Sequence, residues 1–94
     1  MYIHPMLEWD EAKRRRTLDE RGIDFADMAA LFDGRPVLER GDDRSDYPEL
    51  RYVRIGRVRG RLFVVVWTPR GQNARIISAR KANAREARAI GRRL

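Results

Sequence analysis

The 94-residue chain is predicted to be an α+β protein with two N-terminal helices, an antiparallel meander of about four strands, and a C-terminal helix. The only long apolar run, Leu62 to Trp67, lies between turn-forming residues and is predicted to be the central strand. An amphipathic segment over residues 25–32 predicts a helix before the sheet. Asn83, followed three positions later by a glutamate, begins the helix after it. We expect residues 1–94 to form a single domain.

The first helix is expected over residues 11–20, because Asp10 can cap its start and Gly22 can end it. Before it, Met6–Trp9 is short and apolar, and either adds an edge strand or packs under the sheet. The helix itself has a weak apolar face and a basic turn at residues 13–16. That turn is either a solvated flank or part of the border of a nucleic-acid site.

The second helix follows Asp24, which is suited to capping it, and ends at Asp33 and Gly34. Ile23, just before the cap, is placed to pack against the first helical turn. Apolar residues recur with helical spacing and predict one buried face, formed by Phe25, Met28, Ala29 and Phe32.

The strands are separated by turn signals, of which Arg59-Gly60 is the tightest. We expect strands within residues 36–40, 51–58, 62–67 and 75–79. The acidic stretch from Gly41 to Leu50 is predicted to be a hairpin connection. Its acids Asp42, Asp43 and Asp46 have no neighbouring histidine, so we expect no metal site and no cofactor.

Charge is divided unevenly along the chain. Residues 1–50 hold 8 basic and 13 acidic residues, whereas residues 51–94 hold 13 basic residues and one acid, for a net charge of +7. This division predicts a basic face built by the C-terminal half, suited to a polyanion or an acidic protein. Nearly all the cations are arginine, which binds phosphate in a bidentate fork.

Common catalytic groups are scarce. The chain has no cysteine, and its single histidine, His4, is not expected to be catalytic. No apolar stretch is long enough to span a bilayer, so we expect a cytoplasmic protein with no membrane partner. Arginine can stabilise a phosphate under attack by a ribose hydroxyl, or can simply bind a nucleic-acid backbone. Composition alone leaves both readings open.

The segments LEWDEAKRRRTLDERGIDFADMAALF, RLFVVVWT and RIISARKANAREA, in this order and spacing, resemble the BrnT toxins over about residues 7–90. The resemblance implies a RelE-like ribonuclease fold. It also implies the toxin of a type II toxin–antitoxin pair, which cleaves RNA without metal and inhibits translation. The partner would be a BrnA-like antitoxin with a ribbon-helix-helix domain, in a 2:2 complex that reaches operator DNA only through the antitoxin.

Carried over position by position, the resemblance implies a site rich in arginine. The catalytic candidates are Glu49, Arg51, Arg70 and Arg80. The RNA-binding candidates are Trp9, Lys13, Arg21, Arg54 and Arg75. Arg80 and Arg51 are expected to point to a common edge of the sheet.

Several of these residues have a second reading. Trp9 is suited to anchoring the core as well as to stacking on a base. Glu49 is either a general base or a surface acid paired with Arg51, and Arg80 is able to form a structural salt bridge with Glu86. Arg21 stands where the family usually has histidine. The alternative function is therefore a nucleic-acid-binding or regulatory module without catalysis, a decayed toxin.

Overall fold

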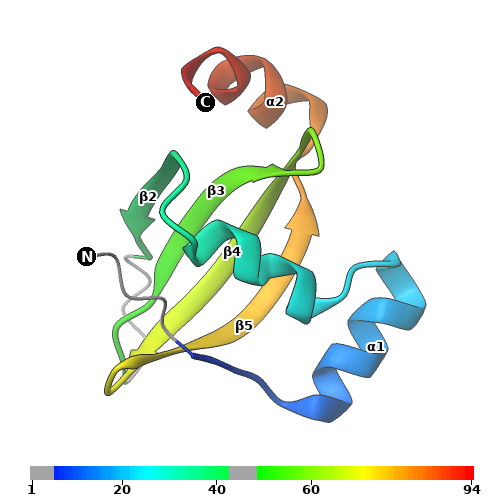
Figure 1. Cartoon of the computed structure of the whole chain (residues 1–94). Coiled ribbons are helices and arrows are strands. Elements are labelled where there is room, and N and C mark those ends of the chain that lie inside the picture. Colours follow the sequence, from blue (N-terminus) through cyan, green and yellow to red (C-terminus); the bar gives the residue numbers. More distant parts are fainter. Residues whose placement is uncertain (1–5, 43–48) are drawn as a thin grey trace.

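The computed structural model describes residues 6–42 and 49–94, and it shows an α+β fold around a five-stranded sheet of order β1-β5-β4-β3-β2 (Figure 1). The strands are β1 Leu7–Glu8, β2 Val37–Gly41, β3 Tyr52–Val58, β4 Arg61–Arg70 and β5 Asn73–Lys81. The helices are α1 Glu11–Arg21 and α2 Ala84–Ile90, with 3-10 helices η1 Phe25–Phe32 and η2 Gly91–Arg93. His4 and residues 43–48, which include Asp43 and Asp46, lie outside the described residues.

The predicted meander is present but is not the whole sheet. Strands β2 to β5 pair antiparallel with their neighbours in sequence, as expected. Strand β1 adds to the free edge of β5 in parallel, pairing Leu7 with Ala74 and Glu8 with Arg75. The sheet is therefore mixed and five-stranded, which corrects the prediction of about four antiparallel strands and selects the edge-strand reading of Met6–Trp9.

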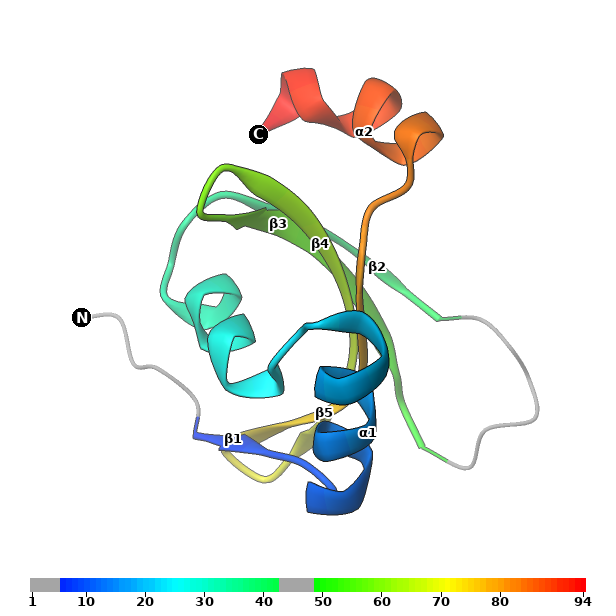
Figure 2. The ribbon, with the colours of Figure 1, turned by 90° about the vertical axis from the view of Figure 1, so that its right-hand side faces the viewer.

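The two faces of the sheet are both covered over β4. Helix η1 lies in the curve of one face, called here the inner face, and the opposite one is the outer face (Figure 2). Val65 on the inner face is 0% exposed and Val64 on the outer face is 3% exposed. Strand β4 is also the middle strand of the five, so the prediction that the apolar run forms the central strand is confirmed.

Helix η1 has a tighter winding than predicted. Phe25, Met28 and Leu31 are buried, at intervals of three residues, and Phe32 is buried beside them. A 3-10 helix has three residues per turn, so positions i, i+3 and i+6 share a face. For this reason the prediction was wrong about Ala29, which is exposed, and missed Leu31.

Helix α1 is held at its ends and not by a buried face. The side chain of Asp10 accepts hydrogen bonds from the first turn, and Gly22 ends the helix with a φ of 69°, so both predicted boundaries are confirmed. No residue of α1 is buried. Arg14 pairs with Asp24 at 2.8 Å, which ties the helix to the start of η1.

Helix α2 begins at the predicted capping box, in which the side chains of Asn83 and Glu86 each accept a hydrogen bond from the other residue's backbone N–H. It lies beyond one end of the sheet, near the β3–β4 turn (Figures 1 and 2). Ile90 and Leu94 pack against the outer-face cluster, and Arg57 donates to the carbonyl of Gly91. Among the described residues, α2 therefore covers one end of the outer face.

The connection predicted over residues 68–74 is mostly strand. Strand β4 continues to Arg70 and β5 begins at Asn73, so the turn is limited to two residues. The ladder shifts register at Val66 and Trp67, which pair with Ser78 and Ile76 and leave Ile77 as an extra residue. None of the helices in the described ranges has the length and apolar character needed to cross a membrane.

Candidate functional site

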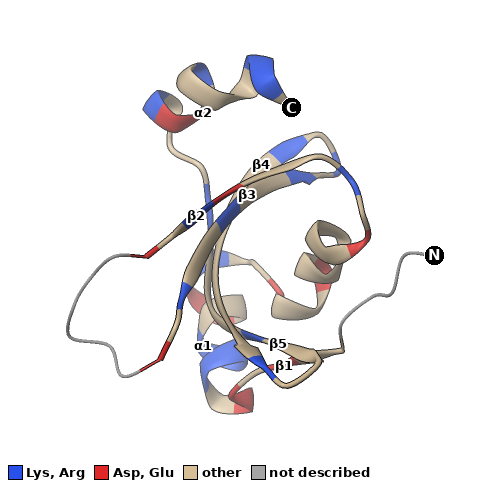
Figure 3. Cartoon of the chain, turned by 90° about the vertical axis from the view of Figure 1, so that its left-hand side faces the viewer, with Lys and Arg blue, Asp and Glu red and all other residues tan. Residues whose placement is uncertain are grey.

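Basic side chains collect on the outer face of the sheet. Strands β3 and β5 both run antiparallel to β4, so β4 ends where β3 and β5 begin. Three arginines stand at that end and, by strand alternation, face outward. They are called here the arginine triad and are Arg51, Arg70 and Arg75. Figure 3 shows basic positions spread over the strands and both α-helices, with acidic positions among them.

One carboxylate bridges two members of the arginine triad. Glu49 lies 3.7 Å from Nη2 of Arg51 through Oε1, and 3.4 Å from Nη2 of Arg70 through Oε2. The side chain of Arg51 is 20% exposed, so its guanidinium is partly shielded from water. A carboxylate beside two guanidinium groups can accept a proton while the cations bind an anion next to it.

The third member of the triad is fixed from β1. Arg75 lies 3.9 Å from Glu8, and the same carboxylate accepts a 2.6 Å hydrogen bond from Asn73. Thr68, buried on β4, donates to the carbonyl of Leu50 and so holds the chain just before Arg51. Arg70 and Arg75 thus stand on strands and Arg51 directly before one, which suits a site that needs fixed geometry.

Lys13 on α1 belongs to the same electrostatic neighbourhood. Its pKa is lowered mainly because the side chain is half-buried, and further by the positive charge of Arg51 and of Arg16. Burial disfavours the charged form of a lysine, so the ammonium group releases its proton more readily than an exposed one. The predicted RNA-binding residue Lys13 is thus also suited to proton transfer.

Arg80 lies at the other end of the outer face, which makes the expected common edge with Arg51 wrong. Arg80 pairs with Val64, and Val64 with Ile55, four positions beyond Arg51 on β3. Strand spacings then separate the two Cα atoms by roughly 16 Å. The cause is the direction of the strands. Strands β3 and β5 run parallel to each other, and Arg51 lies just before the start of β3 whereas Arg80 lies near the end of β5.

Arg80 also forms the structural salt bridge that the sequence left open. Its two terminal nitrogens donate to the carboxylate of Glu86 at 2.7 and 2.8 Å. These bonds, followed by the backbone N–H of Asn83, lower the pKa of Glu86 to about 2. The pair links the end of β5 to α2.

Replacing Glu86 with glutamine should lower the free energy of unfolding by about 1 kcal/mol at pH 7, because the Arg80 side chain is 44% exposed and water weakens the pair. The folded pKa of about 2 lies below the ordinary 4.5, so Glu86 stabilises fully above about pH 4.5 and loses this effect as the pH falls toward 2. The difference between wild type and Glu86→Gln in urea unfolding should therefore shrink from pH 4.5 downward. The exposed Glu20→Gln is the matched control. An equal loss in both variants would contradict the assignment.

A hollow of about 620 Å³ lies between the two ends of the outer face. Its floor is apolar, formed by Val53, Val64 and Val66, and Arg40 and Arg80 stand at its rim. We call this hollow the outer groove. Arg40 and Ser78, which also lines it, were not among the predicted site residues, although Arg40 lies two residues after Leu38 on β2 and therefore shares its face.

Three predicted RNA-binding residues lie away from the outer groove. Arg54 is on the inner face, where its guanidinium stacks 4.3 Å from the Phe32 ring and pairs with Glu39 at 2.6 Å. Trp9 packs partly against the inner core and donates to Glu11. Arg21 donates to the carbonyl of Ala79 at the edge of β5. Arg54 and Trp9 thus take structural positions, and Arg21 borders the strand that carries Arg80.

The fold and the outer face together define a small α+β protein that presents arginines over an apolar sheet surface. The family model for the ribonuclease toxin BrnT of type II toxin–antitoxin systems matches residues 9–86, and the chain belongs to this family. Membership implies ribonuclease activity in general and an antitoxin partner. The comparison with curated proteins gave no match.

Proposed function

We propose that this protein is a cytoplasmic endoribonuclease that cleaves RNA without a metal ion and inhibits translation. Membership of the BrnT family carries the proposal. The arginine triad and Glu49 supply the groups that such a reaction requires, and the outer groove offers apolar surface on which bases can lie. The substrate is single-stranded RNA, whose bases are available for stacking.

Cleavage begins with Glu49 taking the proton from a ribose 2′-hydroxyl. The 2′-oxygen attacks the adjacent phosphorus, and Arg51 and Arg70 neutralise the negative charge that develops on the phosphate oxygens. The bond from phosphorus to the 5′-oxygen breaks, leaving a 2′,3′-cyclic phosphate on one product. Lys13 gives its proton to the departing 5′-oxygen, a role that its lowered pKa favours. Arg80 binds a neighbouring phosphate at the far end of the outer groove.

The direct test is incubation of the purified protein with labelled single-stranded RNA in buffer containing EDTA. We expect products with 2′,3′-cyclic phosphate ends and no loss of rate when divalent metal is removed. Expression in a bacterial cell should arrest growth. Loss of cleavage in EDTA that magnesium restores, or products with 5′-phosphate ends, would contradict the proposed chemistry.

A second candidate function, RNA binding without cleavage, is favoured because two key arginines already form hydrogen bonds within the protein. Arg80 is bound to Glu86, and Arg21, at the family's usual histidine position, is bound to the carbonyl of Ala79. A protein that lacks a proton-transfer group would bind RNA without cutting it. Salt-sensitive RNA binding without cleavage products in the same assay would support this reading. Recovery of cleavage by Arg21→His would then identify the missing group.

We further propose that a BrnA-like ribbon-helix-helix antitoxin inhibits the protein by covering the outer face. The apolar floor of the outer groove continues beyond the part that α2 covers, and Arg40 and Arg80 line it together with one acid, Asp42. A helix with acidic residues and a few apolar anchors matches this surface. A dimeric antitoxin would hold two toxins in a 2:2 complex, and only the antitoxin would contact operator DNA.

Association of toxin and antitoxin should slow by roughly tenfold between low and high salt, because charge attraction speeds the encounter. Arg51→Glu and Arg70→Glu should each slow association further, as measured by stopped-flow mixing. Arg88→Glu, an exposed change on α2, provides the control for net charge. An association rate that responds to neither salt nor the triad would show that the antitoxin binds elsewhere.

A further inference from the structure

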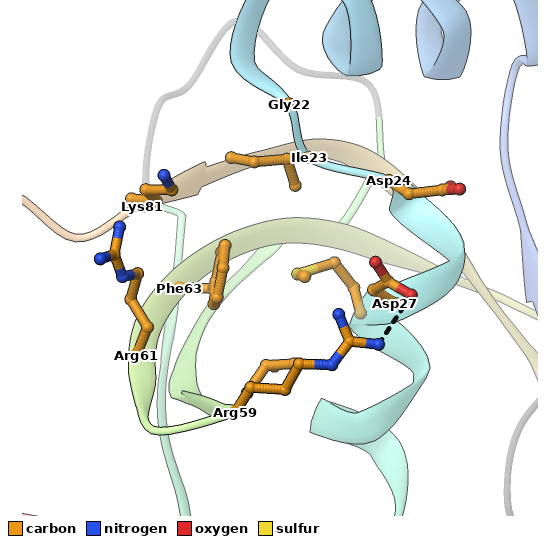
Figure 4. Close-up of a pocket in the computed structure, with 10 residues that line it drawn as sticks. Gly22, Ile23, Asp24, Asp27, Arg59, Arg61, Phe63 and Lys81 are labelled. Carbon is orange, nitrogen blue, oxygen red and sulfur yellow. Dashed lines mark ion pairs between the residues drawn. The ribbon is translucent and has the colours of Figure 1, made fainter.

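A cleft of about 250 Å³ opens on the inner side of the sheet, away from the outer groove. It lies between the start of η1 and the β3–β4 turn, and Figure 4 shows the residues that line it. Its base is apolar and includes Ile23, Met28 and Val58, with the half-buried ring of Phe63 beside them. A half-buried aromatic ring at the base of a cleft is a surface on which a flat ring can pack.

Three cations surround this cleft. Arg61 and Lys81 lie together at one end, while Arg59 extends along the opposite side toward Asp27 (Figure 4). Arg59 is 82% exposed on its side chain and 3.9 Å from Asp27, a loose contact. Within the described part of the chain, Arg61 and Lys81 form no ion pair. They differ in this from the arginines of the triad, each of which contacts a carboxylate.

The backbone conformation of Arg59 is a second reason to consider a ligand in this cleft. Arg59 has a φ of 52°, the only positive φ at a non-glycine position among the described residues, and Gly60 follows with 79°. Two-residue hairpin turns of this kind favour asparagine, aspartate or glycine at the first position. Arginine there costs on the order of 1 kcal/mol or more. The turn alone does not require arginine, whereas a ligand in the cleft would use its cation.

Asp27 helps to decide the chemical class of that ligand. An acidic peptide would match the three cations but would meet repulsion from the Asp27 carboxylate. A nucleotide fits both signs of charge, because its phosphate binds the cations while a base N–H group donates to a carboxylate. Its base can stack on Phe63, as single-stranded bases do on aromatic side chains.

We propose that this cleft binds one nucleotide of single-stranded RNA that flanks the nucleotides held in the outer groove. Arg80 and Lys81 are consecutive, and strand alternation places them on opposite faces at the end of β5. The end of this strand therefore joins the rim of the outer groove to the rim of the cleft. The inference rests on the proposed function for the identity of the ligand, and its test separates binding from cleavage.

The test measures binding of 2′-O-methyl RNA, which lacks the attacking hydroxyl, by fluorescence anisotropy. The double variant Arg61→Gln/Lys81→Gln should bind a 12-nucleotide RNA about tenfold more weakly than wild type. Its salt slope should be smaller by about 0.7, because the contact with one phosphate is removed. A 3-nucleotide RNA, short enough for the outer groove alone, should change less than twofold. The matched control is Arg88→Gln/Arg92→Gln, which removes the same charge from exposed positions of α2 and η2.

A second measurement places the base. RNA carrying 5-iodouracil should form a photo-crosslink to Phe63 in the wild-type protein, and much less in the Arg61→Gln/Lys81→Gln variant. Equal weakening by the test and control variants, or a crosslink that maps outside the cleft, would overturn the proposal. The same holds if the test variant binds RNA normally but binds an antitoxin weakly, since the cleft would then serve a protein. Crosslinking without any cleavage of natural RNA would instead refute the proposed nuclease and leave the cleft standing.

Discussion

Arg51→Ala should lower the rate of RNA cleavage by about 100-fold or more, the usual effect of removing one group that stabilises a charged transition state. Arg51 and Arg70 both contact Glu49, and the side chain of Arg51 is the less exposed of the two. Water therefore screens its charge less. The measurement is single-turnover cleavage of a labelled RNA at saturating enzyme. Growth arrest on expression should weaken in parallel.

Two further variants make this result specific. Arg51→Lys keeps the charge but loses the bidentate fork, so we expect a smaller yet clear loss of rate. Arg88→Ala removes an exposed arginine from α2 and should leave the rate within about twofold, since surface changes have small effects. If Arg51→Ala cleaves RNA as fast as Arg88→Ala, the proposed site is wrong.

Phe25→Ala should lower the free energy of unfolding by about 3–5 kcal/mol, the cost of removing a buried aromatic ring from a packed core. Phe25 is 0% exposed and packs in the inner core with Met28 and Ile76. Urea unfolding followed by circular dichroism measures the change. A loss of this size would remove much of the stability of a small domain.

The comparison variant for Phe25→Ala is Leu18→Ala on α1. Leu18 is 39% exposed on a helix with no buried residue, so its truncation should cost less than about 1 kcal/mol. Similar losses in the two variants would mean that the Leu18 side chain of α1 contributes as much to stability as the buried ring of Phe25, which would contradict this account of the core. A change in the slope of the urea transition would point to a change in the unfolded state.

The elements with a local signal could be predicted from the sequence. The caps at Asp10, Asp24 and Asn83 are set by neighbours within three residues, and all three are confirmed. The short strand β1 could not be recognised in the same way, because Leu7–Glu8 becomes a strand only through its pairing with β5. The winding of η1 likewise depends on the sheet beneath it.

Which face of the sheet each candidate site residue occupies depends on whether an even or an odd number of positions separates it from its neighbours along the strand. Arg51 and Arg54 are three residues apart, so alternation alone places them on opposite faces, and this signal was available in the sequence. Arg75 and Arg80 are five apart and would also be on opposite faces of a regular strand. The register shift around Ile77 turns both outward, and a bulge of this kind has no clear signal in the residues that form it.

During synthesis, the ribosome makes the acidic half of the chain before the basic half. Strand β4 would still lack β5, its partner on one side, and β1 would have no strand to join until Ala74 and Arg75 are made. A nascent chain that ends before β5 therefore carries no Arg75 or Arg80 and cannot complete the outer groove. The outer groove is therefore complete only once synthesis has passed the end of β5.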